Sequence, residues 1–187
     1  MARKYVRISQ DAFSKFAVDS GLLLKSFDVT GEQEVLDSDI VCATTGNVTA
    51  TCVPTYSDLG EDVNNCPNGM KELKHLDYWK ATLGFTALEI SEDVLKVALG
   101  AADVSDGKVA PRMELKSEDF ADYWLVVDLL GGGTAAVHMM NGLSSEGFSA
   151  TFAKNSKTQL SVTLEGHVSI NDQDTVPMEF YLLEAGE

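Results

Sequence analysis

The last third of the chain, residues 122–183, constrains the fold most because one alternating apolar and polar segment follows another there. The clearest of these segments is residues 159–171. Its apolar side chains fall on one face: Leu160, Val162, Leu164, Val168 and Ile170. A period of two is typical of a strand with one buried and one solvated face. We therefore expect a mainly β protein and interpret residues 159–171 as one strand.

Two more strands are predicted immediately before this segment, over residues 123–130 and 134–140. The three glycines between them, residues 131–133, supply positive φ without a Cβ penalty and so favour a tight hairpin. We interpret Asn141-Gly142 as the next reversal of the chain. The final strand, residues 176–183, contains Pro177 near its start, which suits a sheet edge.

The first hundred residues predict a mixture of helix and strand. Spaced phenylalanines predict a short helix over residues 11–19, and the segments expected to be strands are residues 22–29, 40–53 and 79–90. The clearest helix begins after Ser91 as N-cap, has two acids in its first turn, and ends at Gly100. Its apolar stripe predicts packing on a sheet, whereas residues 101–119 are expected to be irregular.

A long polar segment, residues 54–78, separates two of the predicted strands. Loops without structure beyond about 12–15 residues are uncommon in compact domains unless they are functional or disordered. This one contains Tyr56, Leu59, Val63 and Leu73, which a free-standing loop would leave in contact with water. We expect the loop to dock onto another subunit.

Size and charge exclude several classes of protein. A chain of 187 residues with 44% hydrophobic content predicts a single compact domain, residues 1–187. The net charge of -15, from 29 acidic and 14 basic residues, argues against adhesion to nucleic acid. No apolar run reaches the roughly 20 residues of a membrane span, and no secretory signal is recognisable, so we expect folding in a cytoplasm. The three cysteines have no metal-ligand spacing and predict free thiols.

Candidate chemistry is sparse. The histidines, residues 75, 138 and 167, have no metal-ligand spacing, and the glycines at 131–133 precede a strand where a phosphate loop precedes a helix. No grouping of Ser, His and acid can be assembled. Two acidic clusters could supply calcium with oxygen ligands: Asp172 and Asp174, and Asp58, Glu61, Asp62 and Asn64. Turn chemistry for the first and a solvated or interface loop for the second are the favoured interpretations. We expect no catalytic residue, no cofactor and no metal, and therefore no enzyme.

The order of these segments resembles that of the tail tube proteins, also called major tail proteins, of long-tailed bacteriophages. The resemblance covers most of the chain and depends on element order and local patterns. The segments that carry it are residues 20–28 (SGLLLKSFD), 45–49 (TGNVT), 56–62 (YSDLGED), 79–86, the helix after Ser91, 166–170 (GHVSI) and 176–181 (VPMEFY).

The resemblance implies a β-sandwich or barrel flanked by one short α-helix, with a long inter-strand loop and an extended N-terminal arm. Such subunits assemble as hexameric rings, which stack into the tube through which DNA passes from capsid to host. By position, the arm is residues 1–10 and the loop residues 54–78. The implied partners are the chain itself, the tape measure, tail tip and tail terminator proteins, and DNA that passes without specific binding, with no membrane. The implied location is the virion tail, after assembly in the host bacterial cytoplasm.

The site residues follow from these positions. The expected inter-subunit contacts are Tyr5, Tyr56, Leu59, Asp62, Val63, Leu73 and Tyr78. An acidic lumen would repel phosphates, and the acids proposed to face it, all on predicted strands, are Glu89, Asp128 and Glu165. The alternative is a β-sandwich module that binds carbohydrate or another ligand through Tyr56, Tyr78 and Trp79 or through calcium. A contractile tail, a non-contractile tail and a bacteriocin-like particle all remain open.

Overall fold

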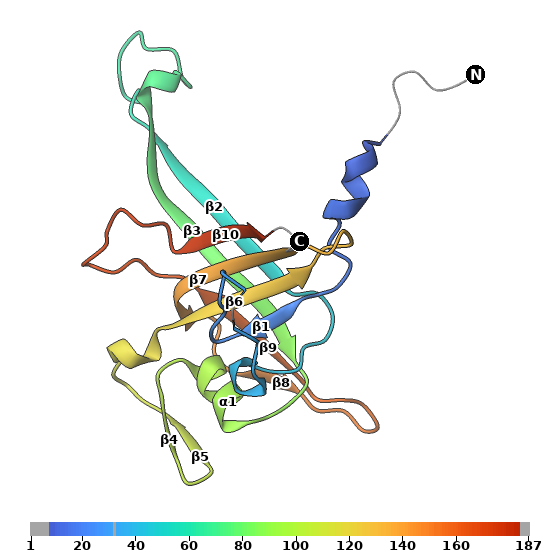
Figure 1. The fold of residues 1–187 in the computed structure, drawn as a ribbon. Coiled ribbons are helices and arrows are strands. Elements are labelled where there is room, and N and C mark those ends of the chain that lie inside the picture. The colour runs from blue at the N-terminus through green and yellow to red at the C-terminus, as the bar shows by residue number, and fades with distance from the viewer. Residues whose placement is uncertain (1–7, 32, 184–187) are drawn as a thin grey trace.

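The computed structural model describes residues 8–31 and 33–183, and its regular structure is mainly β (Figure 1). The strands are β1 (Leu22–Leu24), β2 (Thr49–Asp58), β3 (Lys74–Ala87), β4 (Ala102–Ser105), β5 (Lys108–Pro111), β6 (Ala121–Asp128), β7 (Thr134–Ser144), β8 (Ser149–Thr151), β9 (Gln159–Glu165) and β10 (Met178–Leu183). The described residues contain one α-helix, α1 (Glu92–Leu99), and the 3-10 helices η1 (Gln10–Lys15), η2 (Asp37–Asp39), η3 (Lys71–Leu73) and η4 (Ser117–Asp119). The predicted mainly β fold class with one short α-helix is confirmed.

One antiparallel sheet runs in the order β1-β6-β7-β9-β3-β2, with β10 also paired to β7 and β8 to β9. Strand β7 belongs to both halves of this sheet. Its first part pairs with β6 and β10, and its last residues, Leu143 and Ser144, pair with β9. The two halves cover one hydrophobic core, as in a β-sandwich, and β4 and β5 form a separate hairpin.

The core contains side chains from both halves of the sheet and from α1. Its buried members are Leu23, Val41, Cys42, Ala81, Leu83, Phe85, Ala87, Val94, Ala98, Tyr123, Leu125, Met139, Leu160, Val162, Leu164 and Met178. The helix prediction is confirmed in detail. The Ser91 hydroxyl accepts a hydrogen bond from the Val94 amide at 3.2 Å, and Gly100 ends the helix with φ 70°. Val94 and Ala98, two residues of the apolar stripe, are buried in the core, so the helix packs on the sheet as predicted.

The predicted β6–β7 hairpin is also confirmed. The Leu129 amide donates to the Gly133 carbonyl at 2.7 Å. Gly132 adopts φ 89°, a backbone conformation that costs glycine little free energy because it has no Cβ. Strand β10 lies at an edge, as Pro177 predicted, since among the described strands it pairs with β7 alone.

The interpretation of Asn141-Gly142 as a reversal is wrong, because β7 continues through both residues. Asn141 adopts φ 48°, and the register with β6 shifts at this point. A Cβ on Gly142 would lie 2.8 Å from the Tyr123 ring. The pair is therefore a bulge, and bulges bend a strand. This one lies where β7 passes from one half of the sheet to the other.

The predicted strand over residues 159–171 is too long. Strand β9 ends at Glu165. The next residue, Gly166, lies so close to the Pro177 backbone that a Cβ there would be 3.0 Å from the Pro177 carbonyl oxygen, and the chain leaves the sheet at this contact. Val168 and Ile170 are consequently exposed, Ile170 to 82%. The alternation of apolar and polar residues over residues 166–171 therefore does not mark a buried face.

Other boundaries near the N-terminus also differ. The predicted helix over residues 11–19 is η1, the strand over 22–29 shortens to β1, and the strand over 40–53 begins only at Thr49. Residues 101–119 include the β4–β5 hairpin, whose turn places Asp106 at φ 47° and Gly107 at φ 80°. β1 is short and pairs with the distant β6, so the local pattern does not fix its bounds, whereas β4 and β5 pair with each other across a local turn.

Candidate interaction surface on the β2–β3 hairpin

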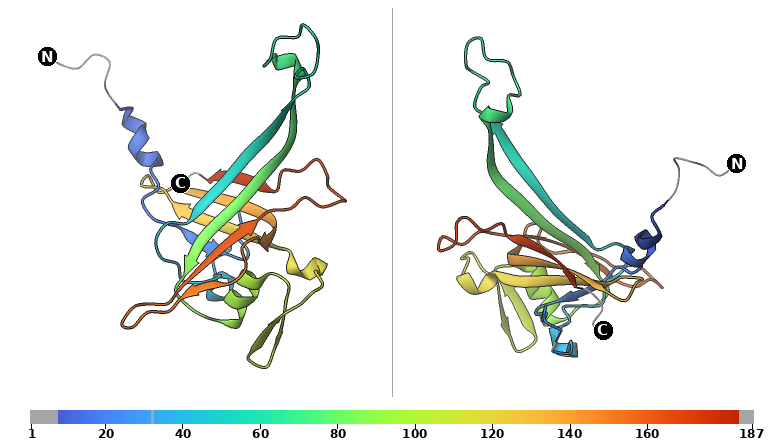
Figure 2. Two further views of the ribbon diagram at one scale, coloured as in Figure 1. Left: turned by 180° about the vertical axis from the view of Figure 1, so that it is seen from behind. Right: turned by 45° about the horizontal axis from the view of Figure 1, so that its top comes forward.

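Strands β2 and β3 are long, and their outer halves project well beyond the rest of the molecule (Figures 1 and 2). The inner half of β3 alternates between buried and half-buried residues from Ala81 to Ala87. Its outer half has no second layer over it, and residues 74–78 are all exposed. We call the projecting part, residues 53–80, the arm.

The predicted loop over residues 54–78 is wrong in its extent. Residues 54–58 and 74–78 are paired strand residues, and the loop at the tip is residues 59–73. β2 lies at the edge of the sheet and pairs with β3 on one side. Pro54 is therefore tolerated inside β2, because a missing N–H on the side without a partner strand removes no hydrogen bond from the sheet. The β-favouring residues Thr55, Tyr56 and Tyr78 are the signal that could have revealed the strands.

The tip of the arm is organised by one carboxylate, that of Asp58. Its Oδ1 accepts a hydrogen bond from the Gly60 amide at 3.0 Å, and its Oδ2 accepts one from the Gly69 amide at 3.0 Å. The Lys74 ammonium lies 3.7 Å away. These amides, the Gly60 amide first, hold the pKa of Asp58 below its ordinary value because they stabilise the charged form. Asp58 therefore acts as the connector between the two ends of the tip.

A second carboxylate, that of Asp77, fastens the strands below the tip. Asp77 is the extra residue of a bulge, because Thr55 pairs with Tyr78 and Tyr56 with Leu76. It accepts a hydrogen bond from the Ser57 hydroxyl at 2.6 Å and lies 3.0 Å from Nδ1 of His75. The bond from Ser57, followed by that from His75, lowers the pKa of Asp77.

Large apolar side chains are exposed along this ordered arm. Tyr56 and Leu76 lie directly opposite each other, so they share one face of the ribbon. Tyr56 is 56% and Tyr78 57% exposed. We call the full set the arm surface: Val53, Tyr56, Leu59, Val63, Met70, Leu76 and Tyr78. Tyr56 and Leu76 lie on one face of the ribbon, Val53 and Tyr78 on the other, and Leu59, Val63 and Met70 at the tip. Exposed apolar side chains gathered on a projection are a candidate contact for another macromolecule.

Most of the expected contact residues lie on the arm. Tyr56, Leu59, Val63 and Tyr78 are exposed there, and Asp62 lies exposed in the tip. Leu73 instead is half-buried, and its side chain packs where a Cβ on Gly60 would be. Tyr5 lies outside the described residues. Sequence reasoning missed Val53, Met70 and Leu76 as members of the surface and Asp58 as its organiser.

The three acids proposed to face a lumen are not brought together. Glu89 lies beyond the end of β3, which corrects its placement on a strand, and it accepts a hydrogen bond from the Ala43 amide at 2.9 Å. Asp128 ends β6 in one half of the sheet. Glu165 ends β9 in the other half, 3.6 Å from the Lys80 ammonium.

The solvent side of β2, β3 and β9 carries mainly hydroxyl side chains. Its residues, assigned from the strand register, are Thr49, Thr51, Thr55, Tyr78, Lys80, Thr82, Thr86, Ser161, Thr163 and Glu165, with Val53 as an apolar member. Thr51 and Thr82 share a hydrogen bond between their hydroxyl oxygens. The charges of this face are Lys80 and Glu165, which pair with each other, so the face presents no cluster of cations that would hold phosphates.

Neither a protein-family model nor a curated protein matches this chain. Among residues 8–31 and 33–183, no group of three or more His, Cys, Asp or Glu side chains could hold a metal ion. The same part of the chain includes no helix with the length and apolar character to cross a membrane.

Proposed function

We propose that the chain is a structural subunit that assembles with copies of itself, as the tail tube protein of a long-tailed bacteriophage. In this proposal, hexameric rings stack into a tube that conducts DNA from the capsid to the host. The observation that carries it is the arm surface. Its apolar side chains contribute nothing to the core of their own chain, although Asp58 and Asp77 hold the backbone that presents them.

Burial against a neighbouring subunit would give these side chains a role. Removing apolar surface from water is worth about 25 cal/mol per Å². A long projecting hairpin also reaches past the edge of its own subunit, which suits contact between successive rings. Tyr56, Leu59, Val63 and Tyr78 are the residues that we assign to this contact.

The charge distribution supports a conduit for DNA. The chain carries a net charge of -15, and the hydroxyl-rich face of β2, β3 and β9 presents no unpaired cation among its described residues. A tube wall with this charge and these side chains would repel phosphates or leave them unbound, so DNA would slide along it. The tape measure, tail tip and tail terminator proteins are the further partners of this proposal, with the virion tail as its location.

The proposal is tested by electron microscopy of the concentrated protein together with light scattering. We expect hollow rings or tubes with sixfold end views. A variant in which Asn-Gly replaces residues 59–73 should remain folded, because Asp58 and Lys74 face each other in the register and a two-residue turn can join them. It should fail to stack, which sedimentation would detect.

The matched control is Met113→Ser, which removes a fully exposed apolar side chain away from the arm. This variant should assemble as the unmodified chain does. Tubes formed by the Asn-Gly variant would contradict the role that we assign to the tip.

A ligand-binding module is the second candidate, and the exposed rings of Tyr56 and Tyr78 favour it, since sugars stack on such rings. A protein that stays monomeric at every concentration and binds a glycan would support this candidate. In that case, Tyr78→Ala should abolish the binding.

A further inference from the structure

The chain contains two Asn-Gly pairs, residues 68–69 and 141–142, and the structure places them in opposite environments. In such a pair, the backbone nitrogen of the glycine can attack the side-chain carbonyl carbon of the asparagine. Glycine permits this close approach because it has no Cβ and a wide choice of backbone conformations. Whether the attack takes place in a folded protein depends on how firmly the two reacting groups are held.

The pair in β7, Asn141-Gly142, is firmly held. The side-chain nitrogen of Asn141 donates to the His167 carbonyl oxygen at 3.0 Å, and its backbone amide donates to the Asp122 carboxylate at 2.9 Å. Gly142 is buried, and a Cβ on it would lie 2.8 Å from the Tyr123 ring. The attack requires the asparagine side chain to turn onto the glycine nitrogen, and these contacts oppose that rotation.

The other pair, Asn68-Gly69, lies in the tip of the arm, at the far end of the hairpin (Figures 1 and 2). Both residues are exposed. Gly69 adopts φ 80°, and a Cβ on it would have no described atom within 4 Å apart from its chain neighbours. Within residues 8–31 and 33–183, no group forms a hydrogen bond with the Asn68 side chain. This side chain can therefore turn onto the Gly69 nitrogen.

One restraint acts on the tip pair, the hydrogen bond from the Gly69 amide to Oδ2 of Asp58 at 3.0 Å. The bond involves the reacting atom itself, because the Gly69 nitrogen must lose its proton in order to attack. The Asp58 carboxylate stabilises the N–H form by accepting its hydrogen bond, and its negative charge repels the anion that would form. Asp58 should therefore slow the reaction at Asn68.

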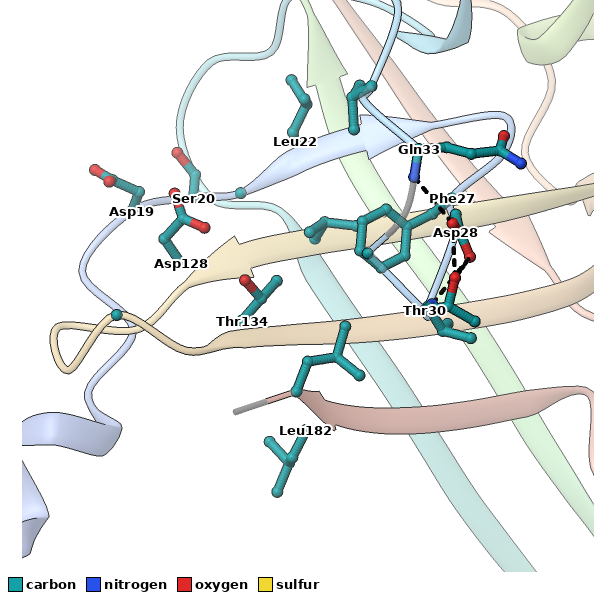
Figure 3. A pocket seen from close by; sticks show the side chains of 17 residues that line it. Asp19, Ser20, Leu22, Phe27, Asp28, Thr30, Gln33, Asp128, Thr134 and Leu182 are labelled. Atoms are coloured by element: carbon teal, nitrogen blue, oxygen red, sulfur yellow. Dashed lines mark hydrogen bonds between the residues drawn. The ribbon is translucent and has the colours of Figure 1, made fainter. Parts of the chain in front are cut away.

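A second carboxylate, that of Asp28, holds a turn in a similar way. It accepts hydrogen bonds from the Thr30 amide at 2.9 Å and the Gln33 amide at 3.1 Å (Figure 3). The residues before these two are Val29 and Glu32, so neither amide belongs to an Asn-Gly pair. The combination of a carboxylate with the glycine amide of such a pair is therefore a property of the tip.

We propose that Asn68 is a site of spontaneous deamidation in the folded chain and that Asp58 sets its rate. The Gly69 nitrogen loses its proton to a solvent base and forms a bond to Cγ of Asn68. The bond from Cγ to the side-chain nitrogen then breaks, and this nitrogen takes up a proton and leaves as ammonia. The product is a five-membered succinimide.

Water opens the succinimide at either of two bonds. Cleavage between Cγ and the ring nitrogen gives aspartate, and cleavage between the backbone carbonyl carbon and the ring nitrogen gives isoaspartate. Either product adds a carboxylate to the tip that Asp58 organises. The inference goes beyond the proposed function and does not depend on it, because the reaction needs only one chain.

Mass spectrometry of the full chain tests the site. The dilute protein is incubated at mildly alkaline pH and digested with pepsin in acid, which stops further reaction. We expect aspartate and isoaspartate to accumulate at residue 68, whereas Asn141 stays unmodified. In the chain unfolded by urea both asparagines should react, because the contacts that distinguish them are then lost.

Asp58→Asn tests the role of the carboxylate. Asn68 should react roughly two- to tenfold faster in this variant, the factor that corresponds to the loss of one hydrogen bond. The matched control is Asp62→Asn, which removes the same charge from another exposed residue of the tip and should leave the rate at Asn68 unchanged. Far-UV circular dichroism checks that each variant is folded.

Three results would each overturn the inference. The first is an Asn68 that stays unmodified in the folded chain although it reacts in urea. The second is an Asn141 that reacts as fast as Asn68 in the folded chain. The third is an equal rate at Asn68 in Asp58→Asn, Asp62→Asn and the unmodified chain. All three are measured without reference to rings or tubes, so a failure here is distinct from a failure of the proposed function.

Discussion

The inner and outer halves of the β2–β3 pair share one antiparallel ladder but differ in what their side chains contact. In the inner half, Ala81, Leu83 and Phe85 are buried in the core. In the outer half, Tyr56, Leu76 and Tyr78 remain exposed, and the ribbon is held by its ladder and by the carboxylates of Asp58 and Asp77. Apolar residues are thus buried in the core at one end of the hairpin and exposed to solvent at the other.

The difference predicts which property each half controls. Substitutions in the inner half should lower the free energy of unfolding, whereas substitutions in the arm should weaken association and leave folding almost intact. The experiments below measure both properties for each half, starting with the largest expected effect.

Leu83→Ala should cost about 2–5 kcal/mol of unfolding free energy, because it leaves a cavity around a side chain that is 1% exposed. Chemical denaturation followed by circular dichroism would measure this. The control on the same strand is Lys80→Ala, which loses an exposed ion pair with Glu165 and should cost within about 1 kcal/mol. Equal losses for the two variants would contradict the placement of the core.

Tyr56→Ser combined with Leu76→Ser removes one cross-strand pair from the arm. Such pairs contribute roughly 0.2–1 kcal/mol, so the unfolding free energy should fall by about that amount. Assembly followed by light scattering should be lost, since both residues belong to the arm surface. A stability loss as large as that of Leu83→Ala would mean that the arm belongs to the folding core, and unchanged assembly would remove the arm from the subunit contact.

Local sequence rules predicted the parts of the fold that depend on neighbouring residues. Ser91 and Gly100 mark the ends of α1, the glycines at 131–133 make the β6–β7 turn, and Pro177 points to the edge position of β10. The rules failed where a residue distant in the sequence determines the course or the end of a strand. The bulge at Asn141 exists because β7 changes partners, and β9 ends where Gly166 meets the Pro177 backbone.

The candidate site shows the same limit. Tyr56, Leu59 and Val63 were found because apolar residues stand out in a polar segment. The strands that carry them were missed because the segment begins with Pro54 and is rich in acids. The sequence predicts for Asp58 only a place in a solvated or interface loop, with calcium binding as the alternative, since its amide partners are recognised only once the tip is folded.

The smallest predicted effect is a local one, at the tip of the arm. Because the folded pKa of Asp58 is lowered, its stabilisation of the tip is fully present above the unfolded value of about 3.9 and is lost as the pH falls through the folded value. Hydrogen exchange at the Gly60 and Gly69 amides, corrected for its intrinsic pH dependence, should therefore accelerate as the solution is acidified through that range.

Asp58→Asn provides the matched control, because it keeps the size of the side chain and removes its charge. Its Gly60 and Gly69 amides should exchange faster than those of the unmodified chain at pH values above about 5, and the rates should no longer respond to acidification. Amides in the inner half, such as that of Phe85, should be unaffected in both proteins. Unchanged exchange in Asp58→Asn would show that the Leu59 and Leu73 backbone contact holds the tip by itself. The arm would then remain ordered without its carboxylate, and the distinction between its two halves would depend on side-chain burial alone.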